Sequence, residues 1–195
     1  MQIETLKLGQ LDTNCYLAWC EITDEAIIID PADEGGFISE KILELGLKPV
    51  AIILTHGHFD HILGLLELKL NFPQVSIMMH EADLFLTESV QKRAQHWLKM
   101  QVAPAPKIDK FLVEGDLVEF GQEVLTIIHT PGHTPGSICL HDDQMMFTGD
   151  TLFRDGVIGR TDLSYSSPKK MYKSLEKIRE LSGSRQMYAG HGASF

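Results

Sequence analysis

The sequence predicts an α/β domain in which two sheets are sandwiched between helices. Three observations predict this fold class. Short apolar runs of strand length dominate the middle of the chain, stretches with helical spacing flank them, and no repeat, low-complexity tract or linker interrupts the 195 residues. A sheet must bury each apolar face against another layer, so strands of this kind need helices on their outer sides. We therefore expect one domain, residues 1–195.

The first half of the chain begins with three predicted strands. Short or alternating apolar runs place these strands near 2–8, 14–20 and 25–29, and they would form a meander. Helical spacing of apolar residues then predicts a helix over 36–46, which Gly46 would end. The wholly apolar run 50–54 predicts a strand buried on both faces, because parallel strands beneath helices have this composition.

The second half repeats this organisation. A leucine-rich helix is expected at about 61–71, followed by a strand at 75–79 and helical structure from Glu81 to about Met100. Trp97 in this segment would pack on the core, which we favour, or line the mouth of a substrate site. Further strands are expected near 111–113, 117–120, 123–129, 136–141, 144–148 and 185–189, with a helix at 168–181.

Charge and composition exclude several classes of partner and location. The 17 Lys and Arg against 27 Asp and Glu give a formal net charge of -10, which disfavours nucleic acid because that affinity depends on cationic contacts to phosphates. No apolar run approaches the ~18 residues of a membrane span, and the first residues lack the pattern of a signal peptide. Three cysteines without a C-x2-C pair do not form a secreted disulfide framework. We expect a cytoplasmic protein that binds neither membrane nor nucleic acid.

The most informative stretch is His56-x-His58-x-Asp60-His61, directly after the buried strand at 50–54. The four side chains able to coordinate a metal can converge on one point only if the loop curls around a bound group. Imidazoles combined with carboxylates suit Zn(II) or Fe(II). A polar turn with solvated histidines is the alternative, and we disfavour it.

Three further motifs also follow predicted strands. The motifs are His129-Thr-Pro-Gly-His-Thr-Pro-Gly136, which contains His133, Phe-Thr-Gly-Asp-Thr, which contains Asp150, and Gly-His-Gly, which contains His191. His129 is expected to be a hydrogen-bonded core or turn residue. Asp30 would either orient a ligating histidine, as ligating histidines usually require, or cap its own Asp-Pro turn.

Together, these motifs resemble those of the metallo-β-lactamase fold superfamily, and most closely its type II glyoxalase (hydroxyacylglutathione hydrolase) branch in a short single-domain form. The resemblance covers nearly the whole chain, including Thr13-Asn-Cys-Tyr16 and Ile29-Asp-Pro31. It implies a four-layer αββα sandwich, with two mixed sheets flanked by helices.

The resemblance also implies two divalent metal ions, with zinc as the first choice and iron or manganese as alternatives. The first ion would be bound by His56, His58 and His133. The second would be bound by Asp60, His61 and His191, and Asp60 is also expected to be catalytic. Asp150 resembles the carboxylate that bridges the two ions.

The implied activity is metal-dependent hydrolysis of a small-molecule thioester such as a hydroxyacylglutathione, with a metal-bridging hydroxide as nucleophile. A thiol leaves without a strong proton donor, which suits a site with no evident general acid. The alternative is a mononuclear Fe(II) persulfide dioxygenase, because His56, His133 and Asp150 form a set of two imidazoles and one carboxylate. Lactone hydrolysis and promiscuous β-lactamase activity are less favoured.

Substrate contacts are where the sequence departs from glyoxalases. Their Cys-Gly-Lys-Phe-Tyr-like stretch after Phe153 is replaced here by residues 154–162. Phe153 is expected to form a wall of the substrate site, and Arg160 would either hold a substrate carboxylate or pair with Asp162. Because the chain ends four residues after His191, no C-terminal helical domain is expected. Gly190 stands where proline is common, which would loosen the turn that carries His191.

Overall fold

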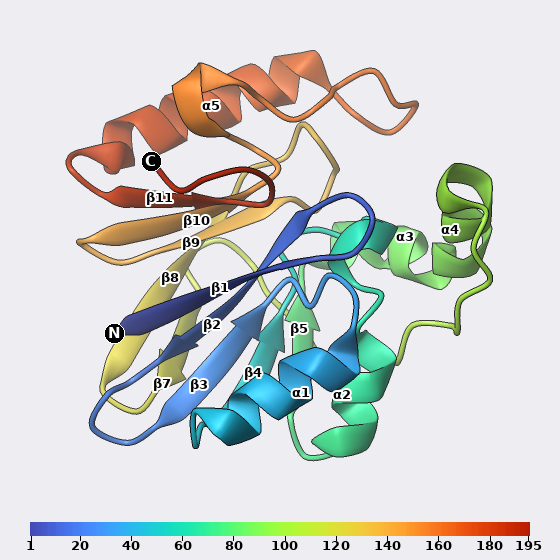
Figure 1. The fold of residues 1–195 in the computed structure, drawn as a ribbon. Helices are drawn as coiled ribbons and strands as arrows, with labels where there is room; N and C mark the ends of the chain where they lie inside the picture. Colours follow the sequence, from blue (N-terminus) through green and yellow to red (C-terminus); the bar gives the residue numbers. More distant parts are fainter.

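The computed structural model describes residues 1–195 and contains two sheets packed face to face (Figure 1). The first sheet has six strands in the order β1-β2-β3-β4-β5-β6. Its first three strands are antiparallel, which confirms the predicted meander, and the remaining pairs are parallel. The strands are β1 (Gln2–Leu8), β2 (Thr13–Trp19), β3 (Glu25–Ile29), β4 (Lys48–Ile53), β5 (Ser76–Met79) and β6 (Lys110–Phe111).

The second sheet has five strands in the order β11-β10-β9-β8-β7. Only the pair of β10 with β11 is parallel, so this sheet is mixed like the first. The strands are β7 (Leu117–Phe120), β8 (Glu123–His129), β9 (Ile138–His141), β10 (Met145–Gly149) and β11 (Gln186–Ala189).

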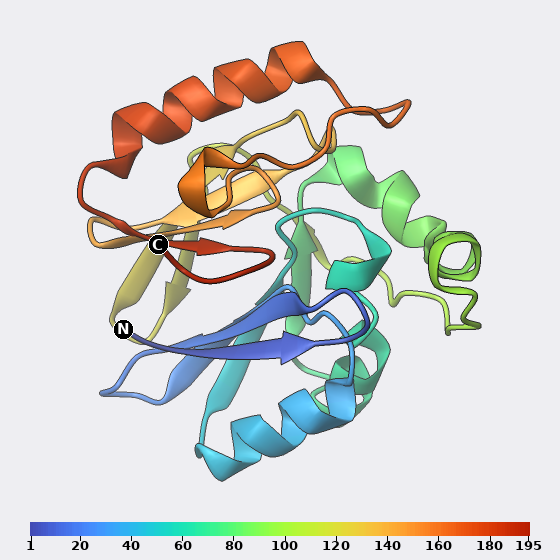
Figure 2. The same ribbon diagram turned by 45° about the horizontal axis from the view of Figure 1, so that its top comes forward.

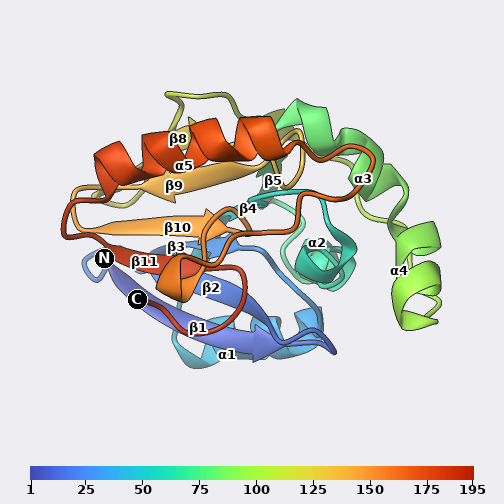
Figure 3. The ribbon, with the colours of Figure 1, turned by 90° about the horizontal axis from the view of Figure 1, so that it is seen from above.

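Helices cover the outer faces of both sheets, which confirms the predicted fold class. Helices α1 (Gly35–Glu44) and α2 (Leu65–Asn71) lie on the first sheet. Figure 2 shows α5 (Pro168–Ser182) along the outer face of the second sheet, on the opposite side of the molecule from α1. Helices α3 (Leu84–Glu88) and α4 (Val90–Leu98) extend sideways from one end of the sandwich (Figure 3). No helix has the length and hydrophobicity to cross a bilayer.

The core has three apolar interfaces, one between each pair of layers. Successive residues of β3 point to opposite faces, so Ile28 packs beneath α1 and α2 while Ile27 and Ile29 pack between the sheets. Ile178 of α5 packs on Met146 and its neighbours in the second sheet. Each layer therefore buries its apolar face against the next.

Two predicted helices differ from those observed, and both differences concern the candidate site. The helix expected over 61–71 begins only at Leu65, because Phe59–His61 form a 3-10 turn that holds Asp60 and His61 against the sheet ends. The helical segment expected over 81–100 is divided into a 3-10 turn at Glu81–Asp83 and the short helices α3 and α4.

Candidate metal centre

Side chains from the ends of three strands form a first group of metal-binding type. His56 and His58 follow β4, His133 follows β8, and Asp150 follows β10. Their facing atoms all lie within 4.8 Å of one another. His133 Nε2 is 2.9 Å from His58 Nδ1 and 3.4 Å from Asp150 Oδ2. Both sheets therefore contribute to one cluster.

A second group lies beside the first and consists of Asp60, His61 and His191. Asp60 Oδ2 is 3.5 Å from His61 Nε2 and 3.3 Å from His191 Nε2. Asp150 also reaches this group, because its Oδ1 is 3.5 Å from His61 Nε2 and its Oδ2 is 3.7 Å from His191 Nε2. Asp150 thus lies between the two groups, and the structure brings all seven predicted ligands together.

The residues fit a pair of metal ions because three of their buried polar atoms have no partner. His56 Nε2, His61 Nε2 and Asp150 Oδ1 are buried without a hydrogen bond. Such atoms are rare in folded proteins, and each costs about 1–3 kcal/mol when unpaired. All three face the two groups, where a bound cation would satisfy them.

In every imidazole of the two groups, the ring nitrogen that faces away from the cluster has a hydrogen-bond partner. Such partners fix the ring orientation and direct the other ring nitrogen toward the cluster. The pairs are His56 Nδ1 with Thr55 Oγ1, His58 Nε2 with the Tyr165 hydroxyl, His61 Nδ1 with Asp30 Oδ2, His133 Nδ1 with the Arg160 carbonyl oxygen, and His191 Nδ1 with the Leu11 carbonyl oxygen. Asp30 therefore orients a histidine, the first of its two expected roles.

Comparison with known proteins agrees with this arrangement. The family model of the metallo-beta-lactamase superfamily matches residues 8–191. The chain belongs to the metallo-beta-lactamase superfamily. All seven clustered residues lie within the matched range.

Individual members of the superfamily are similar over nearly the whole chain. The hydroxyacylglutathione hydrolase GloC of Haemophilus influenzae is 35% identical and is matched over 99% of this chain and 92% of its own. The di-iron-bound structure of TTHA1623 superposes with a TM-score of 0.88 at 33% identity, covering 98% and 93% of the two chains. The structure of the BLEG-1 B3 metallo-beta-lactamase superposes with a TM-score of 0.91 at 28% identity, covering 100% of this chain and 93% of its own. The structure of ETHE1 from Myxococcus xanthus superposes with a TM-score of 0.77 at 28% identity, covering 99% of this chain and 76% of its own.

Electrostatics differ between the two groups of this superfamily site. Burial alone would lower the pKa of His61, but the carboxylates of Asp60, Asp150 and Asp30 raise it to about 10. Burial and the neighbouring imidazoles instead lower the pKa of His56 and His58. His56 and His58 are therefore ready to accept a cation at neutral pH, whereas His61 must first release a proton.

The turn that carries His191 is held firmly. The Asn14 side chain donates hydrogen bonds to the carbonyl oxygens of Ala189 and Gly192, at 2.9 and 2.8 Å. A Cβ at position 190 would overlap Asp150 Oδ1 and crowd His61. The expectation that Gly190 loosens this turn is therefore wrong, since glycine is the residue that lets the strand end approach the cluster.

Asp83 is a functional candidate that no sequence motif indicated. It is fully buried, and its carboxylate accepts hydrogen bonds from Gly57 N at 2.9 Å, Gly136 N at 2.6 Å and Thr134 Oγ1 at 2.6 Å. It thereby ties the loop of His56 and His58 to the loop of His133. Burial raises its pKa, although these donors oppose the rise.

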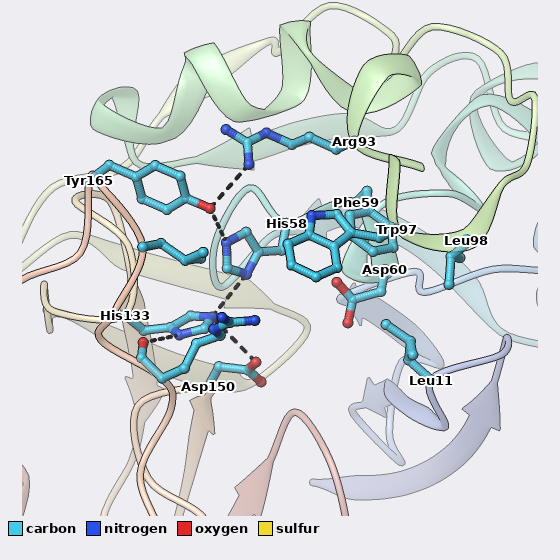
Figure 4. A pocket seen from close by; sticks show the side chains of 12 residues that line it. Leu11, His58, Phe59, Asp60, Arg93, Trp97, Leu98, His133, Asp150 and Tyr165 are labelled. Atoms are coloured by element: carbon cyan, nitrogen blue, oxygen red, sulfur yellow. Dashed lines mark hydrogen bonds and ion pairs between the residues drawn. The ribbon is translucent and has the colours of Figure 1, made fainter. Parts of the chain in front are cut away.

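A cavity of about 230 Å³ opens beside both groups (Figure 4). Its lining includes Trp97 and Leu98 of α4, so this part of the helical segment reaches the cavity while Val90 and Ala94 are buried in the core. The remaining lining residues are Leu11, His58, Phe59, Asp60, Arg93, His133, Asp150, Arg160, Leu163 and Tyr165.

Of the two predicted substrate contacts, Arg160 lines the cavity and Phe153 does not. Arg160 lines the cavity, but its guanidinium donates two hydrogen bonds to Asp162, both at 2.8 Å. Its side chain thus forms the ion pair that was the alternative to substrate binding. Phe153 packs toward the His191 ring, with centroids 6.2 Å apart, and does not line the cavity.

Proposed function

We propose that this chain hydrolyses small-molecule thioesters, a hydroxyacylglutathione among them, with two divalent metal ions held by the seven clustered residues. One observation carries the proposal. Asp150 of the first group also reaches the histidines of the second, and each group contains a buried nitrogen without a hydrogen bond. The similarity to a hydroxyacylglutathione hydrolase over nearly the whole chain supports the reaction class.

His56, His58 and His133 would hold one ion, Asp60, His61 and His191 the other, and Asp150 would contact both. Bound there, the ions would lower the pKa of a water molecule and polarise the substrate carbonyl. The protein residues keep the imidazoles in one tautomer and orientation through their outer partners. Asp60, which contacts both histidines of the second group, would also take part in catalysis.

The donor set favours a thioester over an amide. A thiol, with a pKa near 8.5, leaves without a strong proton donor, so thioester hydrolysis would need no general acid, whereas amide cleavage would. Five imidazoles and two carboxylates with no thiolate suit zinc, iron or manganese. We propose zinc first, with iron as the alternative that the di-iron-bound relative supports.

Charge and cysteine chemistry support the remaining parts of the proposal. The acidic chain would act on a small molecule and not on nucleic acid. Its three cysteines are free and buried, as is usual in a reducing compartment such as the cytoplasm. We also propose that residues 1–195 act as one catalytic domain.

The test combines elemental analysis of the purified protein with four parallel assays. These measure hydrolysis of S-lactoylglutathione, a lactone and a cephalosporin, and oxygen uptake with glutathione persulfide. We expect two metal ions per chain and the fastest turnover with the thioester. One iron per chain with oxygen uptake and no thioester hydrolysis would replace the proposal with the dioxygenase. Faster turnover of the lactone or cephalosporin would replace it with those activities.

A further inference from the structure

The wall of the cavity opposite the metal groups carries one cation that no carboxylate neutralises. Arg93 of α4 forms no ion pair, whereas the other guanidinium in the lining, that of Arg160, is bound to Asp162. Arg93 Nε donates to Ser89 Oγ at 2.9 Å, and Nη1 donates to the Tyr165 hydroxyl at 3.1 Å. A guanidinium has five N–H bonds, so three of them remain available.

Tyr165 connects Arg93 to the first metal group. Its hydroxyl oxygen accepts from Arg93 Nη1, and the same hydroxyl lies 2.9 Å from His58 Nε2. Tyr165 therefore holds the guanidinium in place beside the proposed metal ligands.

Figure 4 shows Arg93, Tyr165, His58 and His133 in one connected line along the cavity. The guanidinium carbon of Arg93 also lies 5.0 Å from the centre of the Tyr165 ring, which fixes the two side chains together. The free N–H bonds of Arg93 thus lie in the cavity wall. A guanidinium can donate two parallel N–H bonds, which match the two oxygens of a carboxylate.

The geometry points to Arg93, positioned by Tyr165, as an anion-binding subsite that selects thioesters carrying a carboxylate. Nonpolar residues of the same cavity, Trp97, Leu98 and Leu163, would surround the uncharged part of the substrate. The inference rests on the proposed function for the reaction, but the binding of a carboxylate does not depend on it. The carboxylate belongs to either the acyl part or the thiol part of the substrate.

The test compares the metal-loaded wild type with Arg93→Gln. Lys92→Gln is the matched control, because Lys92 is an exposed cation on the same helix outside the cavity lining. Three substrates distinguish the source of the carboxylate: the succinyl thioester of N-acetylcysteamine, the butyryl thioester of 3-mercaptopropionate, and the uncharged butyryl thioester of N-acetylcysteamine. Isothermal titration with succinate measures binding without turnover.

We expect Arg93→Gln to lower kcat/KM for one charged thioester by about 10- to 100-fold more than for the uncharged thioester, mainly through KM, as loss of a hydrogen bond to a charged group predicts. Succinate binding should weaken in parallel, and Lys92→Gln should change neither. The charged substrate that suffers the selective loss identifies the part that carries the carboxylate.

Equal losses for all three thioesters, with unchanged succinate binding, would overturn the subsite and leave the hydrolase standing. Weakened succinate binding in a protein that hydrolyses no thioester would keep the subsite and overturn the proposed reaction. Tyr165→Phe gives a second measurement, because it removes the hydroxyl that holds Arg93 in place. We expect weaker succinate binding in this variant at full metal content, and unchanged binding would exclude Tyr165 as the residue that positions Arg93.

Discussion

The side-chain amide of Asn14 donates a hydrogen bond to the carbonyl oxygen of Gly192, at 2.8 Å, across 178 residues of sequence. The same amide group reaches the Ala189 carbonyl, so Asn14 holds both sides of the turn that presents His191. Strand β2 thereby fixes a residue of the second metal group without touching the metal position. This gives a role to the Thr-Asn-Cys-Tyr motif at the start of β2.

Asn14→Ala should release the His191 turn and empty the second group first. The two carbonyl oxygens lose a buried donor, and we expect the unfolding free energy to fall by about 1–3 kcal/mol. Metal analysis and denaturant unfolding check this. Asn71→Ala removes a comparable amide bond, to Ser39, away from the site, and should leave metal content unchanged. Full metal content in Asn14→Ala would refute the role of Asn14.

Gly190→Ala should disrupt the cluster more than any ordinary glycine substitution. The added methyl group would overlap Asp150 Oδ1, so either the carboxylate or the strand end must move. We expect loss of metal and at least a tenfold fall in activity. Gly36→Ala is the control, because its Cβ has room beside Glu67 and the change should be neutral or stabilise by up to ~1 kcal/mol. Wild-type metal content in Gly190→Ala would contradict the steric argument.

Asp83→Asn should separate the two loops that carry the first metal group. An amide keeps only one acceptor oxygen, so at least one of the three donors around this carboxylate would face an NH2 group. We expect a loss of about 1–3 kcal/mol in the unfolding free energy together with weaker metal binding. Asp109→Asn is the control, because that carboxylate also accepts from a backbone amide and from a lysine but lies away from the cluster. If both variants bind metal equally well, Asp83 only stabilises the fold.

His58→Ala should remove activity while the fold persists. The imidazole is one of the proposed ligands of the first ion, and its loss should cost more than the 10–100-fold typical of removing a ligand's outer partner. Circular dichroism and thermal unfolding should stay close to the wild type, because the three apolar interfaces lie elsewhere. His141→Ala, in β9, is the control and should retain activity. Unchanged turnover in His58→Ala would refute the proposed site.

Metal occupancy should depend on pH differently in the two groups. In the metal-free protein His61 keeps its proton below pH 10, so a cation entering the second group must displace that proton, and its affinity falls as the pH falls. His56 and His58 have lowered pKa values and are neutral at pH 7. We expect metal analysis between pH 8 and pH 6 to show loss from the second group first. Equal loss of both ions would contradict this order.

The sequence was sufficient to predict the layers and the clustered residues but not the cavity wall. His56 to His61, His133, Asp150 and His191 all follow apolar strands, and strand ends of neighbouring sheets meet at one edge, so their convergence could be predicted. The anion-binding subsite at Arg93 could not be predicted. Arg93 lies on a short helix and Tyr165 in a loop, 72 residues apart, and their contact depends on how both segments fold back over the site.

The role of Asp83 could not be predicted from the sequence for a related reason. Its neighbours Glu81 and Ala82 show no periodicity, and its three partners lie in two distant loops. Likewise, the start of the helix after His61 depended on a 3-10 turn that apolar spacing does not reveal. The spacing of apolar residues predicts the regular helices and strands, whereas tertiary contacts determine the positions of the turns and loops.

The two metal groups draw their members from both halves of the chain, and this sets an order of events during synthesis. The first group lacks Asp150, and the second lacks His191, until those residues have left the ribosome. Each of these groups is therefore complete only after the second sheet has been made and has docked on the first. Under the proposed function, an ion bound by all members of a group would join the two sheets.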